Sequence, residues 1–78
     1  MGVIIKFRSD ERKNINNLML KIYDKPFRYE MHIRRYNGDN TGEIHVEKRN
    51  GRECENIIND CNVDIISTAV FNEEMSKL

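Results

Sequence analysis

The stretch FRYEMHIRRY, residues 27–36, decides the fold class of this 78-residue chain. Its hydrophobic and polar residues alternate from Phe27 to Arg34. Phe27, Tyr29, Met31 and Ile33 fall on one face of an extended strand, and Arg28, Glu30, His32 and Arg34 fall on the other. Strict alternation is typical of a strand with one face in the core and one in water, as in antiparallel sheets. The sequence therefore predicts an antiparallel sheet that contains this strand.

Three other segments complete the predicted sheet: residues 3–8, 43–49 and 63–71, which alternate or are rich in branched side chains. Residues 37–42 consist of turn-forming types, so we expect 27–36 and 43–49 to form a hairpin. Charge matching favours one register over a slip by two residues, which would oppose like charges. In the favoured register Tyr36 pairs with Glu43, Ile33 with Val46, His32 with Glu47 and Glu30 with Arg49.

Two helices are predicted from hydrophobic residues spaced at i, i+3, i+4 and i+7. The first follows a cap at Ser9 or Asp10, ends at Asp24-Lys25-Pro26, and has the stripe Ile15, Leu18, Met19 and Ile22. The second begins at an Asn50 cap, with Glu53 placed to reach back, and stops at Asn62. Its stripe is Cys54, Ile57, Ile58 and Cys61.

The resulting order, β-α-β-β-α-β, predicts an α+β fold of the ferredoxin-like type, a two-layer sandwich with both helices on one face of a four-stranded antiparallel sheet. Residues 1–71 form this single domain, and residues 72–78 form a short tail or helical turn. In this topology the first and third strands lie in the middle. Residues 27–36 then form an edge of the sheet, and the face opposite the helices is open.

The charges are balanced overall but unevenly distributed along the chain. The formal net charge is zero, so composition indicates neither nucleic acid nor an anionic membrane as a partner. Residues 1–36 contain nine basic and four acidic side chains, whereas residues 37–78 contain four basic and nine acidic ones. Because the predicted sheet interleaves both halves, we expect neighbouring elements to neutralise each other.

The cysteines and the apolar segments indicate a cytoplasmic protein. Cys54 and Cys61 are too far apart on one helix to form a disulfide, which suits a reducing compartment. No signal-peptide pattern and no apolar run of about 20 residues occurs. The ending Ser76-Lys77-Leu78 matches a peroxisomal address, a three-residue pattern that arises easily by chance. Abundant Asn, Ile and Lys are typical of an AT-rich genome, such as that of a low-GC bacterium or its phage.

The open sheet face and the edge strand are the candidate binding surfaces. The candidate residues are Lys6, Arg8, Arg28, Glu30, His32, Arg34, Arg35, His45 and Glu47. Their charges are mixed in sign, which favours another protein or a second copy as partner over a polyanion. An exposed edge of this length invites pairing with another strand, so we expect a homodimer.

The motifs of catalytic and metal sites are missing from the sequence. It contains no glycine-rich phosphate loop, C-x-x-C, H-E-x-x-H or G-x-S-x-G. His32 and His45 can share a face with Glu30 and Glu47, but their spacing shows no converging ligand set. Both cysteines lie on an apolar stripe, which favours a structural role. The sequence thus predicts no enzyme, no cofactor and no metal.

We therefore expect a small non-catalytic protein-binding or regulatory module, such as a phage or mobile-element accessory protein. One alternative is a small-molecule sensor or enzyme with its site at a subunit interface. Another is nucleic-acid binding through Arg28, Arg34 and Arg35, disfavoured because residues 41–47 lack the stacking aromatics of RNA-binding domains on this topology.

Overall fold

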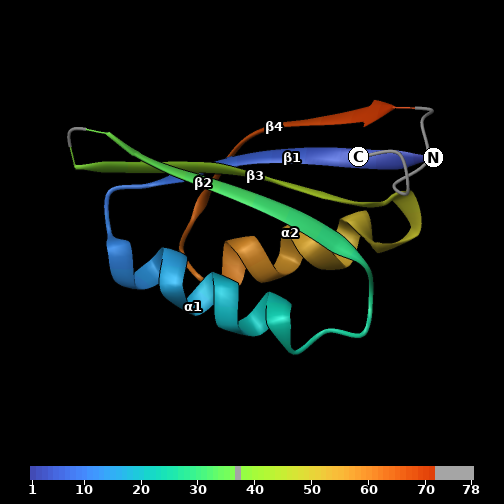
Figure 1. Ribbon diagram of the computed structural model, residues 1–78, viewed down its shortest axis with the longest axis horizontal. Coiled ribbons are helices and arrows are strands. Elements are labelled where there is room, and N and C mark those ends of the chain that lie inside the picture. The colour runs from blue at the N-terminus through green and yellow to red at the C-terminus, as the bar shows by residue number, and fades with distance from the viewer. Residues whose placement is uncertain (37, 72–78) are drawn as a thin grey trace.

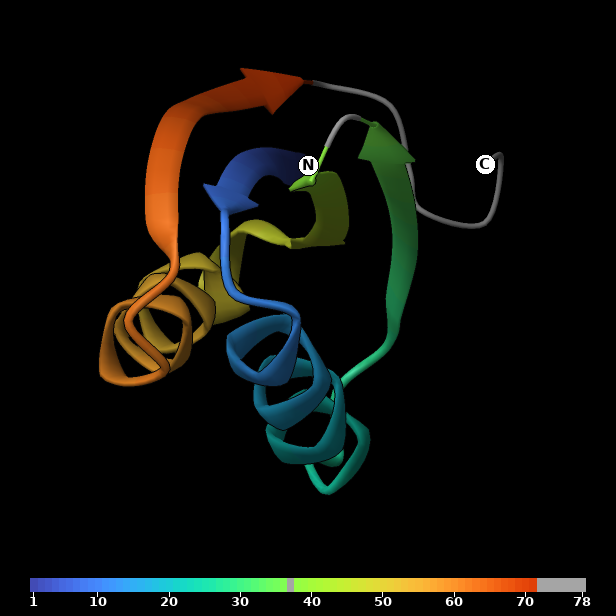
Figure 2. The same ribbon diagram turned by 90° about the vertical axis from the view of Figure 1, so that its left-hand side faces the viewer.

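The alternating segments form one four-stranded antiparallel sheet in the computed structural model, which describes residues 1–36 and 38–71. The strands are β1 (Gly2–Ser9), β2 (Tyr29–Tyr36), β3 (Asp39–Glu47) and β4 (Asp64–Phe71), in the order β2-β3-β1-β4. The helices are α1 (Arg12–Tyr23) and α2 (Gly51–Asp60), and a 3-10 turn, η1 (Lys48–Asn50), precedes α2. Both helices lie on the same side of the sheet (Figures 1 and 2). The predicted ferredoxin-like topology is confirmed, with β1 and β3 in the middle and β2 at an edge.

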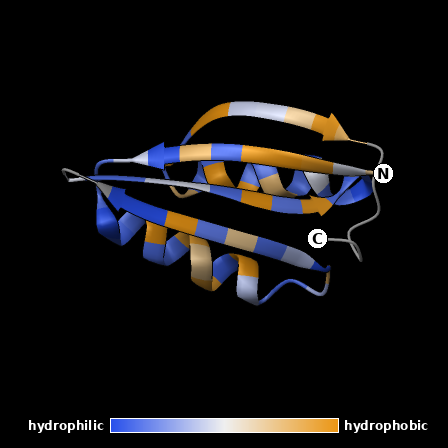
Figure 3. Cartoon of the chain, turned by 45° about the horizontal axis from the view of Figure 1, so that its top comes forward, coloured by the Kyte–Doolittle hydropathy of each residue, from blue (hydrophilic) through white to orange (hydrophobic). Residues whose placement is uncertain are grey.

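The core lies between the two central strands and the helices. Val3, Ile5 and Phe7 of β1 and Ile44 and Val46 of β3 are buried. They pack in one cluster with the stripes of both helices: Ile15, Leu18, Ile22, Cys54, Ile57, Ile58 and Cys61. Hydrophobic and hydrophilic residues alternate along the strands, as Figure 3 shows. The hydrophobic side chains that recur every second residue on the strands therefore pack against those that recur about every 3.6 residues on the helices, in one two-layer core.

The predicted register of the β2–β3 hairpin is wrong by four residues. Tyr36 pairs with Asp39 rather than Glu43, and Ile33 pairs with Gly42 rather than Val46. Tyr36 and Asp39 are the last paired residues before the turn, and Gly38 has a φ of +84°, which glycine adopts without strain. Asparagine followed by glycine is a strong signal for a two-residue hairpin turn, which the longer predicted turn overlooked. A shift by an even number of residues keeps each side chain on its predicted face.

Gly42 is a strand residue, and its missing side chain makes room for Phe7. A Cβ at Gly42 would lie 2.8 Å from the Phe7 ring and 2.7 Å from the carbonyl oxygen of His32. Phe7 pairs with Gly42 across β1 and β3 and is fully buried. The largest core side chain can therefore lie flat against the neighbouring strand.

The caps of α1 differ from the prediction. The N-cap residue is Glu11, and its side chain makes no capping hydrogen bond. The Ser9 hydroxyl accepts a hydrogen bond from the Glu11 N–H at 3.0 Å, so Ser9 shapes the turn before the helix. The helix ends as predicted, with Asp24 as its C-cap. Met19 does not join the buried stripe, because 45% of it is exposed.

The start of α2 also differs, whereas its end is confirmed. Asn50 is the N-cap residue, but it makes no side-chain capping bond, and Glu53 forms an ion pair with Lys25 at 2.9 Å. At the other end Asn62 has a φ of +59°. Its N–H donates a hydrogen bond to the Asn59 carbonyl, and the N–H of Val63 donates one to the Ile58 carbonyl. This pair of bonds is a Schellman motif, in which a left-handed residue stops the helix.

Several predicted strand boundaries move, and β3 begins at Asp39 rather than at residue 43. Phe27 and Arg28 precede β2, Val63 precedes β4, and residues 48–49 belong to η1 rather than to β3. Phe27 and Val63 still pack on the core from these positions. The predicted tail, residues 72–78, lies outside the described residues.

Replacing Gly42 with alanine tests the contact between β1 and β3. Because the new Cβ would meet both backbone and a fixed aromatic ring, we expect Gly42→Ala to lower the free energy of unfolding by about 2 kcal/mol in urea titrations. Gly51→Ala is the control, since its Cβ would meet only Val3 Cγ2 at 3.1 Å and alanine favours the helix. Equal losses for the two variants would contradict this account of Gly42.

Candidate functional site

The open face of the sheet brings together seven of the nine candidate residues. The strand pairings place Arg34 of β2 beside Thr41 of β3, which in turn pairs with Arg8 of β1. The next row contains His32, Glu43 and Lys6, and the one after it Glu30, His45 and Ile4. Glu47 pairs with Gly2 in the last row. The even register shift explains why these side chains share a face although their predicted partners were wrong.

Arg28 and Arg35 do not join this group. Arg28 precedes β2, so the strand does not orient it with Glu30 and His32. Arg35 pairs with Asn40, a buried residue on the helix side of the sheet, and by alternation Arg35 points to that side. Arg34 points to the opposite face. The three arginines proposed for nucleic-acid binding therefore do not form one continuous surface.

Most charges on the open face have partners on the same face. Arg8 contacts Asp39 at 2.9 Å and Asp64 at 4.0 Å, which joins the basic N-terminal half to the acidic C-terminal half. Arg49 contacts Glu47 at 3.2 Å. Partly exposed pairs of this kind each stabilise a fold by less than about 1 kcal/mol. They neutralise Arg8 and Glu47, whereas no carboxylate among the described residues lies within 4.0 Å of Lys6 or Arg34.

His45 is the least exposed polar side chain of the two middle rows, with 13% of its side chain accessible. Its Nε2 lies 3.2 Å from the carboxylate of Glu43, two residues away on the same strand. Its ring lies edge-on to those of His32 and Phe71, with centroids 5.9 and 6.3 Å away. Its buried Nδ1 has no hydrogen-bond partner among the described residues.

The two histidines and their carboxylates do not form a metal site in the part of the chain that the structure describes. No three His, Cys, Asp or Glu side chains converge there as metal ligands. The His45–Glu43 and His32–Glu30 contacts, the latter at 3.9 Å, run along single strands rather than toward a shared centre. This arrangement supports an aromatic and ionic cluster on the sheet surface.

The cysteines are part of the core. Both are buried and free. Burial, followed by the nearby carboxylates of Glu55 and Glu53, raises the pKa of Cys54 to about 12. Burial also raises the pKa of Cys61. A nucleophilic thiol needs a lowered pKa. The raised pKa values of both cysteines therefore agree with the structural role predicted for them.

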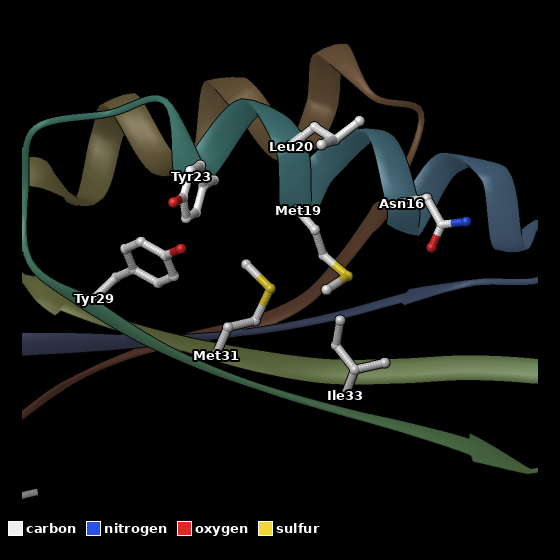
Figure 4. A pocket seen from close by; sticks show the side chains of 7 residues that line it. All are labelled: Asn16, Met19, Leu20, Tyr23, Tyr29, Met31 and Ile33. Carbon is white, nitrogen blue, oxygen red and sulfur yellow. The ribbon is translucent and has the colours of Figure 1, made fainter.

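A groove lined mainly by apolar side chains lies between α1 and β2. It has a volume of about 660 Å³ and is open to solvent. Figure 4 shows Met19 pointing from α1 toward Met31 and Ile33 of β2, and Tyr23 lying over Tyr29. The lining residues are Asn16, Met19, Leu20, Tyr23, Tyr29, Met31 and Ile33.

The groove exists because α1 packs over the middle of the sheet and covers the edge strand only in part. Tyr29, Met31 and Ile33 are half-buried, although their alternation assigns them to the core face. On α1, Leu20 is 69% exposed and Tyr23 is 76% exposed. Large apolar side chains rarely gather on a solvent-facing surface unless that surface binds something.

Sequence reasoning missed this groove. One signal was available in the sequence, because Leu20 and Tyr23 lie outside the buried stripe of α1. A helix with one solvated face usually has polar residues at such positions. The pairing of that second apolar patch with the inner face of β2 required the tertiary structure.

Comparisons with known proteins support the fold alone. No family model matches the sequence, and a search of curated proteins finds no match. The structure resembles the cytoplasmic N-terminal domain of subunit I, a homologue of subunit a, of V-ATPase, with a TM-score of 0.71 and 6% identity. That match covers 82% of this chain but only 22% of the other. A de novo designed protein, Foldit4, matches with a TM-score of 0.60 and 15% identity over 91% of this chain and 97% of its own.

Neither described helix is long and apolar enough to cross a membrane.

The shifted pKa of Cys54 predicts a pH-dependent stability. Because the thiol titrates at about 12 in the folded state and near 9.0 otherwise, the unfolded state loses its proton first as the pH rises. The free energy of unfolding should therefore fall by about 1 kcal/mol more in the wild type than in Cys54→Ala between about pH 8 and pH 10. Urea titrations of both proteins measure this difference. Parallel pH dependences would contradict it.

Proposed function

We propose that this chain is a non-catalytic protein-binding module whose contact surface is the free edge of β2 together with the apolar groove beside it. The observation that carries the proposal is the coincidence, in the described part of the chain, of a strand at the edge of the sheet with exposed large apolar side chains on α1. Backbone groups at a sheet edge bind an extended strand of another chain, and neighbouring pockets accept its side chains.

The distribution of charge supports β2 over the open sheet face. Arg8 and Glu47 on the open face are paired within the chain. Among the described residues, no carboxylate lies within 4.0 Å of the guanidinium of Arg34 or Arg35. These two cations on β2 are available to orient a partner, whereas its apolar anchors would come to lie in the groove.

The proposed setting is the cytoplasm, where the buried thiols of Cys54 and Cys61 stay reduced. Small size and an Asn-, Ile- and Lys-rich composition fit an accessory protein of a phage or mobile element that binds and modulates a host protein. Nucleic-acid binding has less support, because Arg34 and Arg35 point to opposite faces of the sheet.

Photo-crosslinking in native cell extract tests the proposed surface. A benzophenone side chain replaces Leu20 in the groove or, as the control, Ile66, an apolar residue of β4 that is 57% exposed. We expect protein adducts from position 20 and few from position 66, as judged by gel shift and mass spectrometry.

The substitution Tyr23→Asp provides the second half of this test. A carboxylate in the groove disfavours any apolar anchor, because the charge would be desolvated on binding. Adducts from position 20 should then decrease severalfold. Adducts that form mainly at position 66, or that are indifferent to Tyr23→Asp, would refute the groove as a contact surface.

The size of the groove supports a second candidate function, binding of a small apolar ligand at a subunit interface. Its volume of about 660 Å³ lies within the range of small-molecule sites, and its lining is largely apolar. A partner that closes the open side would complete such a site.

Thermal-shift measurements with a panel of apolar metabolites test this candidate. A ligand that binds only the folded state raises the unfolding temperature in proportion to its occupancy. We expect such a shift for the wild type and its loss in Met19→Asp, which places a charge in the groove. A panel without a shift, or a shift retained in Met19→Asp, would exclude the groove as the ligand site.

A further inference from the structure

We infer that the partner on β2 is a second copy of this chain, paired strand to strand and antiparallel about a two-fold axis at His32. The inference rests on the proposed function, since it names the occupant of the same surface. It would join two four-stranded sheets into one sheet of eight strands. Two identical strand edges pair in this way when the side chains of one copy match the side chains that they face in the other copy.

The charges of β2 are self-complementary about His32. With His32 opposite its own copy, residue 30 faces residue 34 of the other strand, twice by symmetry. Glu30 then lies opposite Arg34 of the second copy, and Arg34 lies opposite its Glu30. Opposite charges in directly opposed pairs stabilise a sheet, and like charges destabilise it. The pairing also provides a carboxylate for Arg34, which has none within 4.0 Å among the described residues.

The other face of β2 is complementary in the same register. Met31 lies opposite Ile33 of the second copy, which joins the apolar floors of the two grooves. Tyr29 lies opposite Arg35, so that the second cation without a partner meets an aromatic ring. Because the two-fold axis is perpendicular to the sheet, both pairs of helices lie on the same side. Each groove then borders the other copy rather than water.

Neighbouring registers are worse. Two residues that pair across the interface must lie on the same face of the joined sheet. The two-fold axis therefore passes through a residue position of β2 and never between two residues. An axis at Ile33 places His32 opposite Arg34 and Met31 opposite Arg35. An axis at Met31 places Glu30 opposite His32 and leaves Arg34 and Arg35 beyond the start of the other β2, which begins at Tyr29. Only the axis at His32 matches both the charges and the apolar side chains of residues 29–35.

The second sheet edge, β4, is less regular, although it also exposes Ile66 and Val70. Its pairing with β1 shifts between Lys6 and Phe7, so its ladder contains a bulge, a device that disfavours edge pairing. The pairing of β2 with β3 runs without a shift from Tyr29 to Tyr36. Strand pairing alone buries less area than the roughly 800 Å² per partner of stable interfaces. The apolar groove beside β2 supplies the additional area.

Charge exchange between copies tests the register. Sedimentation velocity at micromolar concentration should show the wild type as a dimer. Glu30→Arg creates two Arg–Arg pairs, and Arg34→Glu creates two Glu–Glu pairs, so each variant alone should have a dissociation constant raised about tenfold or more. Mixed together, the two variants should form a heterodimer, because both opposed pairs are then of opposite charge.

Native mass spectrometry identifies the heterodimer by its mass, and circular dichroism verifies that each variant is folded. Arg52→Glu, a reversal of the same size on exposed α2, should dimerise like the wild type. A monomeric wild type, dimers in both single variants, or a mixture that stays monomeric would each overturn the inference. The proposed function is judged separately, because adducts from position 20 with a different protein would support it even when self-adducts and dimers are absent.

Discussion

The burial of β1 between two neighbouring strands and beneath two helices is the constraint on which the rest of the structure depends. β1 pairs with both β3 and β4, and its residues Val3, Ile5 and Phe7 are buried. Phe7 fits only because Gly42 has no side chain. A chain this small has little apolar surface to bury, so both helices are committed to the same face of the central strands.

That commitment explains where a binding surface can form. α1 directs Ile15, Leu18 and Ile22 toward the core and leaves the inner side chains of β2 partly covered. The edge strand therefore keeps an apolar floor, and the flank of α1 keeps an apolar wall. On the opposite face, contacts such as those of Arg8 with Asp39 and Asp64 neutralise the charges within the chain. The groove beside β2 accordingly remains an apolar surface that α1 covers only in part.

The errors of the sequence analysis have physical causes. Charge matching misplaced the hairpin register because each surface ion pair contributes less than about 1 kcal/mol. The register follows instead from the tight connection between Tyr36 and Asp39, where Gly38 has a positive φ. The capping bonds predicted at Asn50 and Glu53 were replaced by a 3-10 entry and by the contact of Glu53 with Lys25. Charged surface residues were identified as candidates because their alternation is visible in the sequence. The groove was missed because it joins residues of two elements.

Periodicity in the sequence alone determined the order of the elements, the face on which each side chain lies and the core stripes, since these depend on the repeat of a strand or a helix. The stop of α2 at Asn62 was likewise local, because a left-handed residue satisfies the last carbonyls of its own helix. Only the tertiary structure decided the hairpin register, the partner of His45 and the groove beside β2. Each of these depends on how far one element reaches over another, and that distance is determined by packing rather than by the repeat of either segment.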